Sequence, residues 1–267
     1  MKIIVTADLH ADLIKAGATN EIAQLGEAIW RERPEVLIVA GDLVGLGKKY
    51  IVPTLEKLAP PQTKKLIVPG NHDLWLPEGD AFVYYRDALP EIYAKAGFHM
   101  LDQGAVVMNQ VAFVGNIGWY DYSFADPNLP PSQERNYEQQ RWADVCSWND
   151  FVFVKRAMSD QQFCSWLLER LRQQLLSLPA AVTTVVAVTH TVAFAEMVMP
   201  NLKKPAENFF NAFQGSRRIG ELLLSDPRVK YHFCGHTHSS LRLQKGHLLS
   251  VNVGSTYDKK RLEILEV

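Results

Sequence analysis

Five short polar motifs interrupt this chain, and each comes directly after an apolar run of the kind that forms a buried strand. They are Asp8-Leu9-His10, Gly41-Asp42, Gly70-Asn71-His72-Asp73, Thr189-His190 and Gly235-His236-Thr237-His238. The carboxyl ends of parallel strands open on one edge of a sheet, where ligands collect. The pattern constrains the fold because it brings Asp, His and Asn side chains from separated segments to one edge.

Strand and helix signals alternate in the amino-terminal part. Buried strands are predicted at Lys2–Thr6, Val36–Ala40 and Lys64–Val68, and helices at Glu21–Arg31, Tyr50–Leu58 and Asp80–Ala96. Strands that alternate with helices pair in parallel through right-handed crossovers. Three short runs follow at 100–101, 105–108 and 111–114, and we expect them to form antiparallel strands.

The carboxyl-terminal part also contains both helix and strand signals. An amphipathic helix is predicted at Asp160–Ser177, with Ser159 as its N-cap. Further strands are expected at 182–188, 229–234, 240–243, 248–253 and 261–265, and a helix at 215–224. The fold class is therefore α/β, with two facing mixed β-sheets flanked by helices. We expect a single domain over residues 1–267, with an insertion or cap at 119–160 that shows no clean period.

Composition limits the choice of compartment and partner. The 267 residues carry a net charge of −1, which gives no reason to expect nucleic acid or a membrane as partner. The three cysteines are odd in number and lack CxxC spacing, as is typical of reduced thiols in the cytoplasm. The apolar run before Asp8 is too short for a signal peptide, and His190 and Glu196 interrupt Ala180–Met199. We expect a cytoplasmic protein.

The side chains of the motifs have the chemistry of divalent-metal ligands. They are carboxylates, imidazoles and an amide, without a thiolate, which favours Mn, Fe, Zn, Ni or Mg over a structural zinc site. Asp42 is the natural bridging ligand, because each of its oxygens can bind one ion. Two ions roughly 3.5–4 Å apart can activate a shared water and hold a phosphoryl group for in-line attack.

Together the motifs resemble those of the calcineurin-like metallophosphoesterases, D-x-H, G-D, G-N-H-[DE], H and G-H-x-H, which occur here in order between residues 8 and 238. The resemblance implies a β-sandwich flanked by helices and two divalent ions. It assigns one ion to Asp8, His10, Asp42 and His238, and the other to Asp42, Asn71, His190 and His236. It places His72 beside the substrate phosphate, where it stabilises the transition state or protonates the leaving oxygen. Asp73 is expected to orient the loop or His72.

The second motif departs from one branch of that family. Protein Ser/Thr phosphatases continue it as G-D-x-V-D-R-G, whereas residues 41–47 here are GDLVGLG. The missing Asp leaves His72 without its usual partner, and the missing Arg removes a phosphate-binding group. The G-N-H-D form is more typical of small bacterial phosphomonoesterases and phosphodiesterases, so the resemblance points away from protein phosphatases.

Two interpretations of the insertion stay open. In the first, Trp119, Tyr120, Tyr122 and Trp148 shape a pocket over the ions. Substrate contacts are then expected from Asn71, Trp119, Tyr120 and Arg156, with Asn149 as an alternative to Arg156. In the second, the aromatic side chains only pack the insertion against the body. Arg217 and Arg218 could meet a phosphate but are more typical of solvated surface, and His99, His232, His247 and Cys234 are expected to lie outside the ligand set.

The leading hypothesis is an enzyme, a binuclear metallophosphoesterase. A hydroxide that bridges two ions, Mn, Fe, Zn or Ni, would hydrolyse a small-molecule phosphomonoester or phosphodiester. The alternatives are a non-catalytic binding scaffold on the same fold and a DNA-processing nuclease of the superfamily. The first would have lost ligands or His72, and the second would show a basic groove. The sequence leaves the substrate, the native metal and the oligomeric state open.

Overall fold

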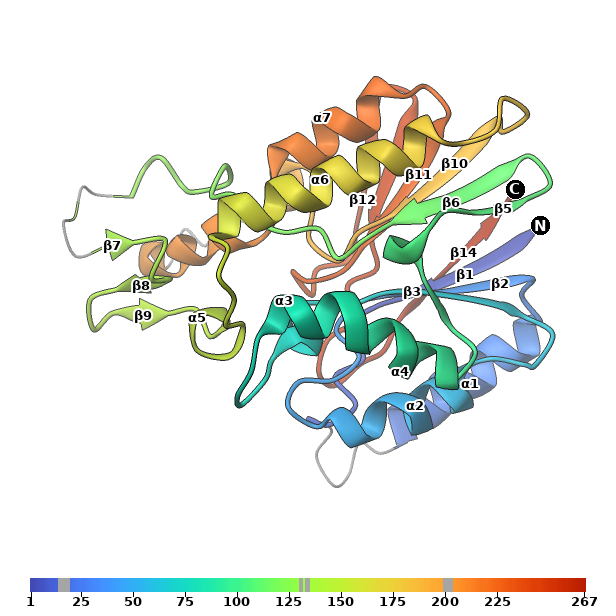
Figure 1. The fold of residues 1–267 in the computed structure, drawn as a ribbon, viewed down its shortest axis with the longest axis horizontal. Coiled ribbons are helices and arrows are strands. Elements are labelled where there is room, and N and C mark those ends of the chain that lie inside the picture. The colour runs from blue at the N-terminus through green and yellow to red at the C-terminus, as the bar shows by residue number, and fades with distance from the viewer. Residues whose placement is uncertain (14–19, 130–131, 133–134, 199–203) are drawn as a thin grey trace.

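The strands predicted from the apolar runs form two sheets that face each other, with helices outside both (Figure 1). The computed structural model describes all residues except 14–19, 130–131, 133–134 and 199–203. From edge to edge, the first sheet contains β14 (Leu262–Glu266), β1 (Lys2–Thr6), β2 (Val36–Ala40), β3 (Lys64–Val68) and β4 (His99–Met100). Strands β1 to β4 run parallel, and β14 is antiparallel to β1.

The second sheet has a parallel centre with antiparallel edges. In spatial order it contains β12 (Leu241–Lys245), β13 (Leu248–Asn252), β11 (Val229–Cys234), β10 (Thr184–Val188), β6 (Val111–Gly115) and β5 (Val106–Met108). Strands β13, β11, β10 and β6 are parallel, whereas β12 and β5 are antiparallel to their neighbours. The two mixed sheets confirm the predicted fold class.

The inner faces of the two sheets form one apolar core. Alternate residues of the first sheet point inward, and they meet the corresponding residues of the second. The fully buried members include Ile3, Val5, Ile38, Val68, Phe113, Val186 and Val188. Because each sheet is covered on both faces, its strands read as continuous apolar runs rather than as alternating ones.

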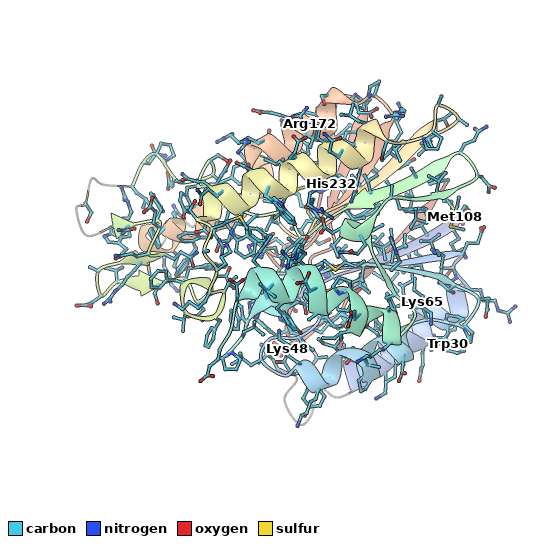
Figure 2. All side chains as sticks on the ribbon, viewed as in Figure 1. Trp30, Lys48, Lys65, Met108, Arg172 and His232 are labelled. Carbon is cyan, nitrogen blue, oxygen red and sulfur yellow. The ribbon has the colours of Figure 1, made fainter. Side chains whose placement is uncertain are left out.

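The outer faces are covered by helices. On the first sheet lie α1 (Asn20–Glu32), α2 (Ile51–Leu58) and α4 (Leu89–Lys95), and on the second α6 (Asp160–Leu176) and α7 (Arg217–Ser225) (Figure 1). Helix α6 begins with the predicted capping residue. The Ser159 side chain accepts from the Gln162 backbone N–H at 3.2 Å, and the Gln162 side chain accepts from the Ser159 backbone N–H at 2.9 Å. Trp30 on α1 is exposed, whereas His232 is interior (Figure 2).

One local prediction is wrong. Strand β4 pairs in parallel with β3, not antiparallel, because α4 returns the chain to the same edge as a crossover helix does. The helical stretch expected at 80–96 is confirmed over residues 81–95, where α3 (Ala81–Val83), a π-helical turn (Tyr84–Ala88) and α4 follow one another without a break. Pro90 lies in the first turn of α4 and has no N–H to donate, and the π-helical turn ends two residues before it.

The insertion contains structure of its own. Strands β7 (Arg135–Asn136), β8 (Arg141–Trp142) and β9 (Cys146–Ser147) form a small antiparallel sheet, and α5 (Asp150–Phe153) follows. The remaining short helices are 3-10 segments at Lys48–Tyr50, His72–Leu74, Leu101–Gln103, Ala195–Met197 and Pro205–Phe213. Within the described residues, no helix is long and apolar enough to cross a membrane.

Candidate metal centre

The loops that carry the motifs are hydrogen-bonded to one another at one end of the two sheets. Backbone N–H groups of Asp8 and His10 donate to the carbonyls of Gly41 and Asp42, both at 2.9 Å. The two sheets are joined there as well, because the His236 backbone N–H donates to Asp8 Oδ1 at 2.8 Å. The parallel strands thus deliver the motif side chains to a shared edge, as the sequence predicts.

Many of these residues hold a left-handed backbone that non-glycine residues seldom adopt. The φ angles are 54° at Asp8, 43° at His10, 52° at Asp42, 73° at His236 and 55° at His238. Each such residue costs about 1–3 kcal/mol, and such strain concentrates at functional sites because the surrounding contacts hold it. The interloop hydrogen bonds are those contacts here.

Glycines in the motifs allow the close approach. A Cβ on Gly70 would lie 2.0 Å from Asp42 Oδ1, and a Cβ on Gly235 would lie 2.4 Å from Asp8 Oδ2. Any side chain at either position would displace a carboxylate. Gly70 and Gly235 are therefore required by the neighbouring loop and not by their own turns, since neither has a positive φ.

One cluster gathers around His190. Its Nε2 lies 3.3 Å from Asp42 Oδ1, 3.2 Å from Asn71 Oδ1 and 3.1 Å from His236 Nδ1. The opposite nitrogens are engaged elsewhere, since His190 Nδ1 lies 3.0 Å from the Ala40 carbonyl and His236 Nε2 lies 3.0 Å from the Phe213 carbonyl. Carbonyls only accept, so these two nitrogens carry protons, and His190 Nε2 and His236 Nδ1 are the nitrogens that face the cluster.

A second cluster shares Asp42. The Nε2 atoms of His10 and His238 lie 3.4 Å apart, and His10 Nε2 lies 3.6 Å from Asp42 Oδ2. Asp8 completes the group, and one ligand atom each from Asp8, His10 and His238 lie within 4.8 Å of one another. Asp8 Oδ2 is buried without a hydrogen-bond partner. The two oxygens of Asp42 thus face different clusters.

The pKa values of these residues are strongly shifted by burial and by the neighbouring charges. Burial lowers the pKa of His10 to about 2, of His236 to about 3 and of His238 to about 4, so these rings are neutral. Burial also raises the pKa of Asp8 to about 7. At His190 burial is outweighed by Asp42, whose charge and hydrogen bond raise the pKa to about 9. The carboxylates of the centre thus attract a positive charge.

The donor atoms fit divalent cations. Two ligands that are each about 2.1 Å from one ion, at right angles, lie about 3.0 Å apart. The spacings of 3.1–3.3 Å around His190 Nε2 are close to this value. Metal ligation requires a neutral imidazole, so an ion among these atoms would take the place of the proton that Asp42 favours on His190 Nε2. Each cluster could therefore hold one ion.

His72 stands beside both clusters but belongs to the cavity. Its backbone N–H donates to Asp42 Oδ1 at 2.9 Å, and its Nε2 lies 3.9 Å from Asp42 Oδ2. The ring stacks on Trp75 with centroids 3.8 Å apart. Its Nδ1 is buried without a partner. A Cβ on Gly45 would lie 3.9 Å from this Nδ1, so position 45 is where the Asp of the protein-phosphatase motif would reach it.

Asp73 holds the loop rather than the ring of His72. Its carboxylate accepts from the backbone N–H groups of Leu43 at 3.1 Å, Val44 at 3.0 Å and Gly70 at 2.8 Å. These bonds join the second and third motifs. Of the two roles predicted for Asp73, the geometry fits the orientation of the loop.

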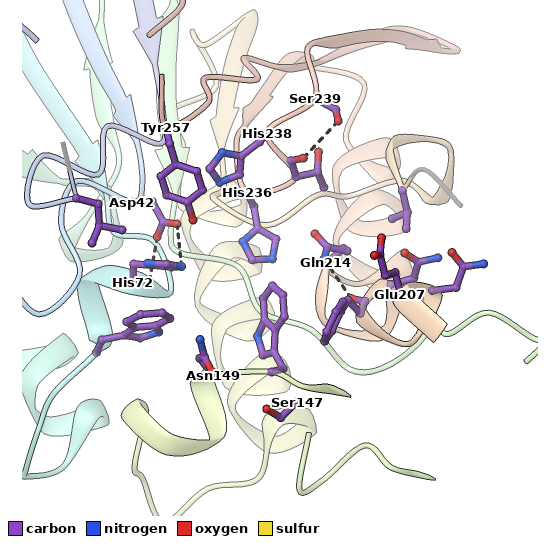
Figure 3. A pocket seen from close by; sticks show the side chains of 18 residues that line it. Asp42, His72, Ser147, Asn149, Glu207, Gln214, His236, His238, Ser239 and Tyr257 are labelled. Atoms are coloured by element: carbon purple, nitrogen blue, oxygen red, sulfur yellow. Dashed lines mark hydrogen bonds and ion pairs between the residues drawn. The ribbon is translucent and has the colours of Figure 1, made fainter. Parts of the chain in front are cut away.

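An open cavity of about 830 Å³ leads to the clusters (Figure 3). Asp42, His72, His236 and His238 form its floor. One wall comes from the insertion, with Ser147, Trp148 and Asn149, and another from the segment after β10, with Phe210, Asn211 and Gln214. Trp75 and Tyr257 lie near His72 and His238, and the remaining lining residues are Leu13, Val198, Glu207, Asn208, Thr237 and Ser239.

The structure places the predicted substrate contacts in two groups. Asn71 lies in the cluster around His190, whereas Trp119 and Tyr120 are fully buried. Arg156 is also buried, paired with Asp160 and positioned over the Trp119 ring. None of these last three lines the cavity, so their predicted contact with substrate is corrected to packing of the insertion.

The remaining side chains of the insertion agree in part with each of its two interpretations, a wall of the cavity and packing against the body. Trp148 and Asn149 line the cavity, as the first interpretation expects, while Tyr122 bonds to Asp160 at 2.6 Å, as the second expects. Arg217 donates to the Ser123 carbonyl at 2.9 Å and lies outside the cavity.

Two residues that contribute to the centre lie outside the motifs and were not predicted. Trp75 follows the third motif by two residues, and Asp150 lies among the aromatic residues of the insertion. Asp150 is 1% exposed and accepts from Asn71, Trp75, Tyr120 and Trp148. An acidic residue flanked by Trp148 and Phe151 is a weak signal, because it does not reveal which distant donors it meets.

The comparisons with known proteins agree with this architecture. The sequence model described as calcineurin-like phosphoesterase matches residues 1–240. The chain belongs to this family. No curated protein matches the sequence.

Solved structures with a similar fold share little sequence with this family member. The phosphopantetheinyl hydrolase PptH of Mycobacterium tuberculosis is 19% identical, with a TM-score of 0.73, over 96% of this chain and 90% of that one. A dimetal phosphatase of Danio rerio is 14% identical, with a TM-score of 0.54, over 96% and 87%. At these identities the likeness establishes the fold alone.

Proposed function

We propose that this chain is a binuclear metal-dependent phosphoesterase. The observation that carries the proposal is the position of Asp42, whose Oδ1 faces His190 and whose Oδ2 faces His10. A single buried carboxylate that faces two groups of imidazole donors is suited to bridge two cations. The ligands would be Asp8, His10, Asp42 and His238 for one ion, and Asp42, Asn71, His190 and His236 for the other.

Two bound ions would supply an activated water and neutralise charge on the phosphate. The protein side chains set the geometry in which this occurs. Asp73 holds the loops of Asp42 and Asn71 together, and Asp8 is held by the His236 backbone. His72, stacked on Trp75 at the floor of the cavity, is placed to donate a hydrogen bond to the phosphate or a proton to the leaving oxygen.

The cavity favours a diester over a monoester. Among its lining side chains that the structure describes, none is Lys or Arg, although a phosphomonoester dianion is best held by such groups. Aromatic rings and uncharged carboxamides suit a bulky, uncharged second substituent instead. The similar fold of a protein named phosphopantetheinyl hydrolase supports testing a diester with an amide-bearing pantetheine arm.

The test is an assay of the purified chain reconstituted in turn with Mn, Fe, Ni and Zn. Rates are measured on paired chromogenic substrates, p-nitrophenyl phosphate and bis(p-nitrophenyl) phosphate, and on a phosphopantetheine diester. We expect metal-dependent turnover that is faster on the diesters. Asp42→Asn serves as the control, because it should lose turnover with every metal.

Two outcomes would contradict the proposal. A chain that elemental analysis shows to hold no metal under any condition, and that hydrolyses none of the esters, would support the non-catalytic scaffold. Metal-dependent cleavage of DNA, with binding retained at moderate salt, would contradict a small-molecule substrate, although not the binuclear chemistry, and would support the nuclease instead.

A further inference from the structure

The insertion reaches the metal centre through one buried carboxylate, that of Asp150 at the start of α5. Its Oδ1 accepts from Asn71 Nδ2 at 3.0 Å and from Trp75 Nε1 at 2.6 Å. Its Oδ2 accepts from Asn71 Nδ2 at 3.1 Å, from Tyr120 Oη at 3.1 Å and from Trp148 Nε1 at 2.8 Å. The donors come from two distant parts of the chain, at residues 71–75 and at Tyr120, and from Trp148 two residues away.

These partners are unusual for a buried charged group. Among the described residues Asp150 forms no ion pair, and all its donors are uncharged. A carboxylate in such a place is stabilised only if its lone pairs are satisfied, and here both oxygens accept more than one bond. If a donor group replaced either oxygen of Asp150, its N–H would face another N–H or O–H donor with no acceptor between them.

The contact decides which way the amide of Asn71 points. A carboxylate can only accept, so the amide nitrogen of Asn71 must face Asp150. The amide oxygen is then turned to the opposite side, where it lies 3.2 Å from His190 Nε2. The reversed amide would present two N–H groups to a cation and could not ligate it.

The same carboxylate positions two cavity walls. Trp75 stacks on His72, and Trp148 stacks on Phe213 with centroids 5.7 Å apart. Both indoles line the cavity and both donate their N–H to Asp150. A single side chain of the insertion thus contacts a ligand residue and both indole walls.

We propose that Asp150 is a positioning residue that orients Asn71 for the ion of the His190 cluster and couples the insertion to that ion. The inference rests on the proposed function, since it requires that cluster to bind metal. It assigns the insertion a role in metal binding as well as in shaping the cavity. Residues that orient metal ligands typically change metal affinity by about 10–100-fold when they are removed.

The first experiment measures binding of Mn and Zn to Asp150→Asn by isothermal titration calorimetry. We expect one of the two ions to lose about 10–100-fold in affinity while the other is retained, because only the His190 cluster is disturbed. The matched control is Asp160→Asn. Asp160 is also a buried carboxylate of this region, accepts from Trp119 at 2.8 Å and Tyr122 at 2.6 Å, and contacts no proposed ligand. This control should bind both ions as the wild type does.

The second experiment exchanges the two side chains. Asn71→Asp alone places two carboxylates against each other and should weaken the same ion. Asn71→Asp combined with Asp150→Asn restores a hydrogen bond, and either oxygen of the new Asp can ligate whichever way it turns. We expect the double variant to recover part of the affinity lost in either single variant, because the new amide at position 150 can donate to the carboxylate at position 71 although it also faces an indole N–H. A purely structural role would not produce this recovery.

The outcomes separate the two proposals. Wild-type protein that binds fewer than two ions contradicts the proposed function itself. Wild-type protein that binds two ions, with Asp150→Asn binding both equally well, overturns the role of Asp150 alone. Should Asp150→Asn fail to fold by circular dichroism, the Asn71→Asp variant decides, because unchanged affinity there would also overturn the inference.

Discussion

Replacement of Gly70 by alanine tests how closely the second and third motifs must approach. The added Cβ would lie 2.0 Å from Asp42 Oδ1 and 2.3 Å from the Asp42 backbone nitrogen. Even a tight contact of 3.0 Å between this Cβ and Asp42 Oδ1 would require the two atoms to move apart by 1.0 Å. Metal–ligand distances tolerate only about 0.2 Å. We therefore expect Gly70→Ala to lose the bridging role of Asp42 and, with it, at least one ion.

The magnitude follows from the displacement. A misplacement of about 1 Å in a catalytic site costs roughly 100-fold in rate, and loss of an ion costs more. The assay combines metal content by plasma mass spectrometry with turnover on bis(p-nitrophenyl) phosphate. Circular dichroism and urea unfolding show whether the variant is folded.

A matched glycine separates this effect from backbone strain. Gly246 has a φ of 56°, and a Cβ there would meet nothing within 4 Å. Gly246→Ala should cost about 1–2 kcal/mol of stability and leave metal content and turnover unchanged. A Gly70→Ala protein with two ions per chain and wild-type turnover would refute the steric reasoning.

Three further variants test separate parts of the centre. His72→Ala should retain both ions by elemental analysis but lose turnover roughly 100-fold or more, and near-normal turnover would remove His72 from the mechanism. Asp73→Asn should lower the free energy of unfolding by about 2 kcal/mol, measured in urea, because it breaks carboxylate bonds to three backbone N–H groups; an unchanged midpoint would contradict this role. Burial lowers the pKa of His232 to about 3 from 6.5, so the unfolded state binds the proton and stability falls as the pH drops below about 6.5. His232→Gln should reduce that loss by about 1.4 kcal/mol per pH unit between pH 6 and 4.5, and equal slopes for the two proteins would show that His232 does not contribute.

The strands of the fold were accessible from sequence because their signals are local. Buried parallel strands read as continuous apolar runs, and β1, β2, β3 and β11 have the predicted bounds. The helix α6 was equally clear, since its cap and its apolar face both lie within the segment. The direction of β4 was not clear, because two residues carry no information on which neighbour they pair with.

The predicted ligand set could be located in sequence for a related reason. Each motif that carries ligands sits at the end of its own strand, so the order of strands in the sheets brings the ligands together without any further specification. The wall residues do not follow this rule. Trp119 and Trp148 are the same residue type and both lie in irregular segments, yet Trp119 is fully buried whereas Trp148 lines the cavity.

By itself, therefore, the sequence determined the two-sheet architecture, the family and the side chains that the sheet edge would gather. Local periodicity and strand-end position encode those features directly. Only the tertiary structure decided that Asp150 would meet an amide 79 residues away, and which indoles would face the cavity. Those contacts depend on how an irregular segment packs against loops distant in the chain, and no local pattern specifies that packing.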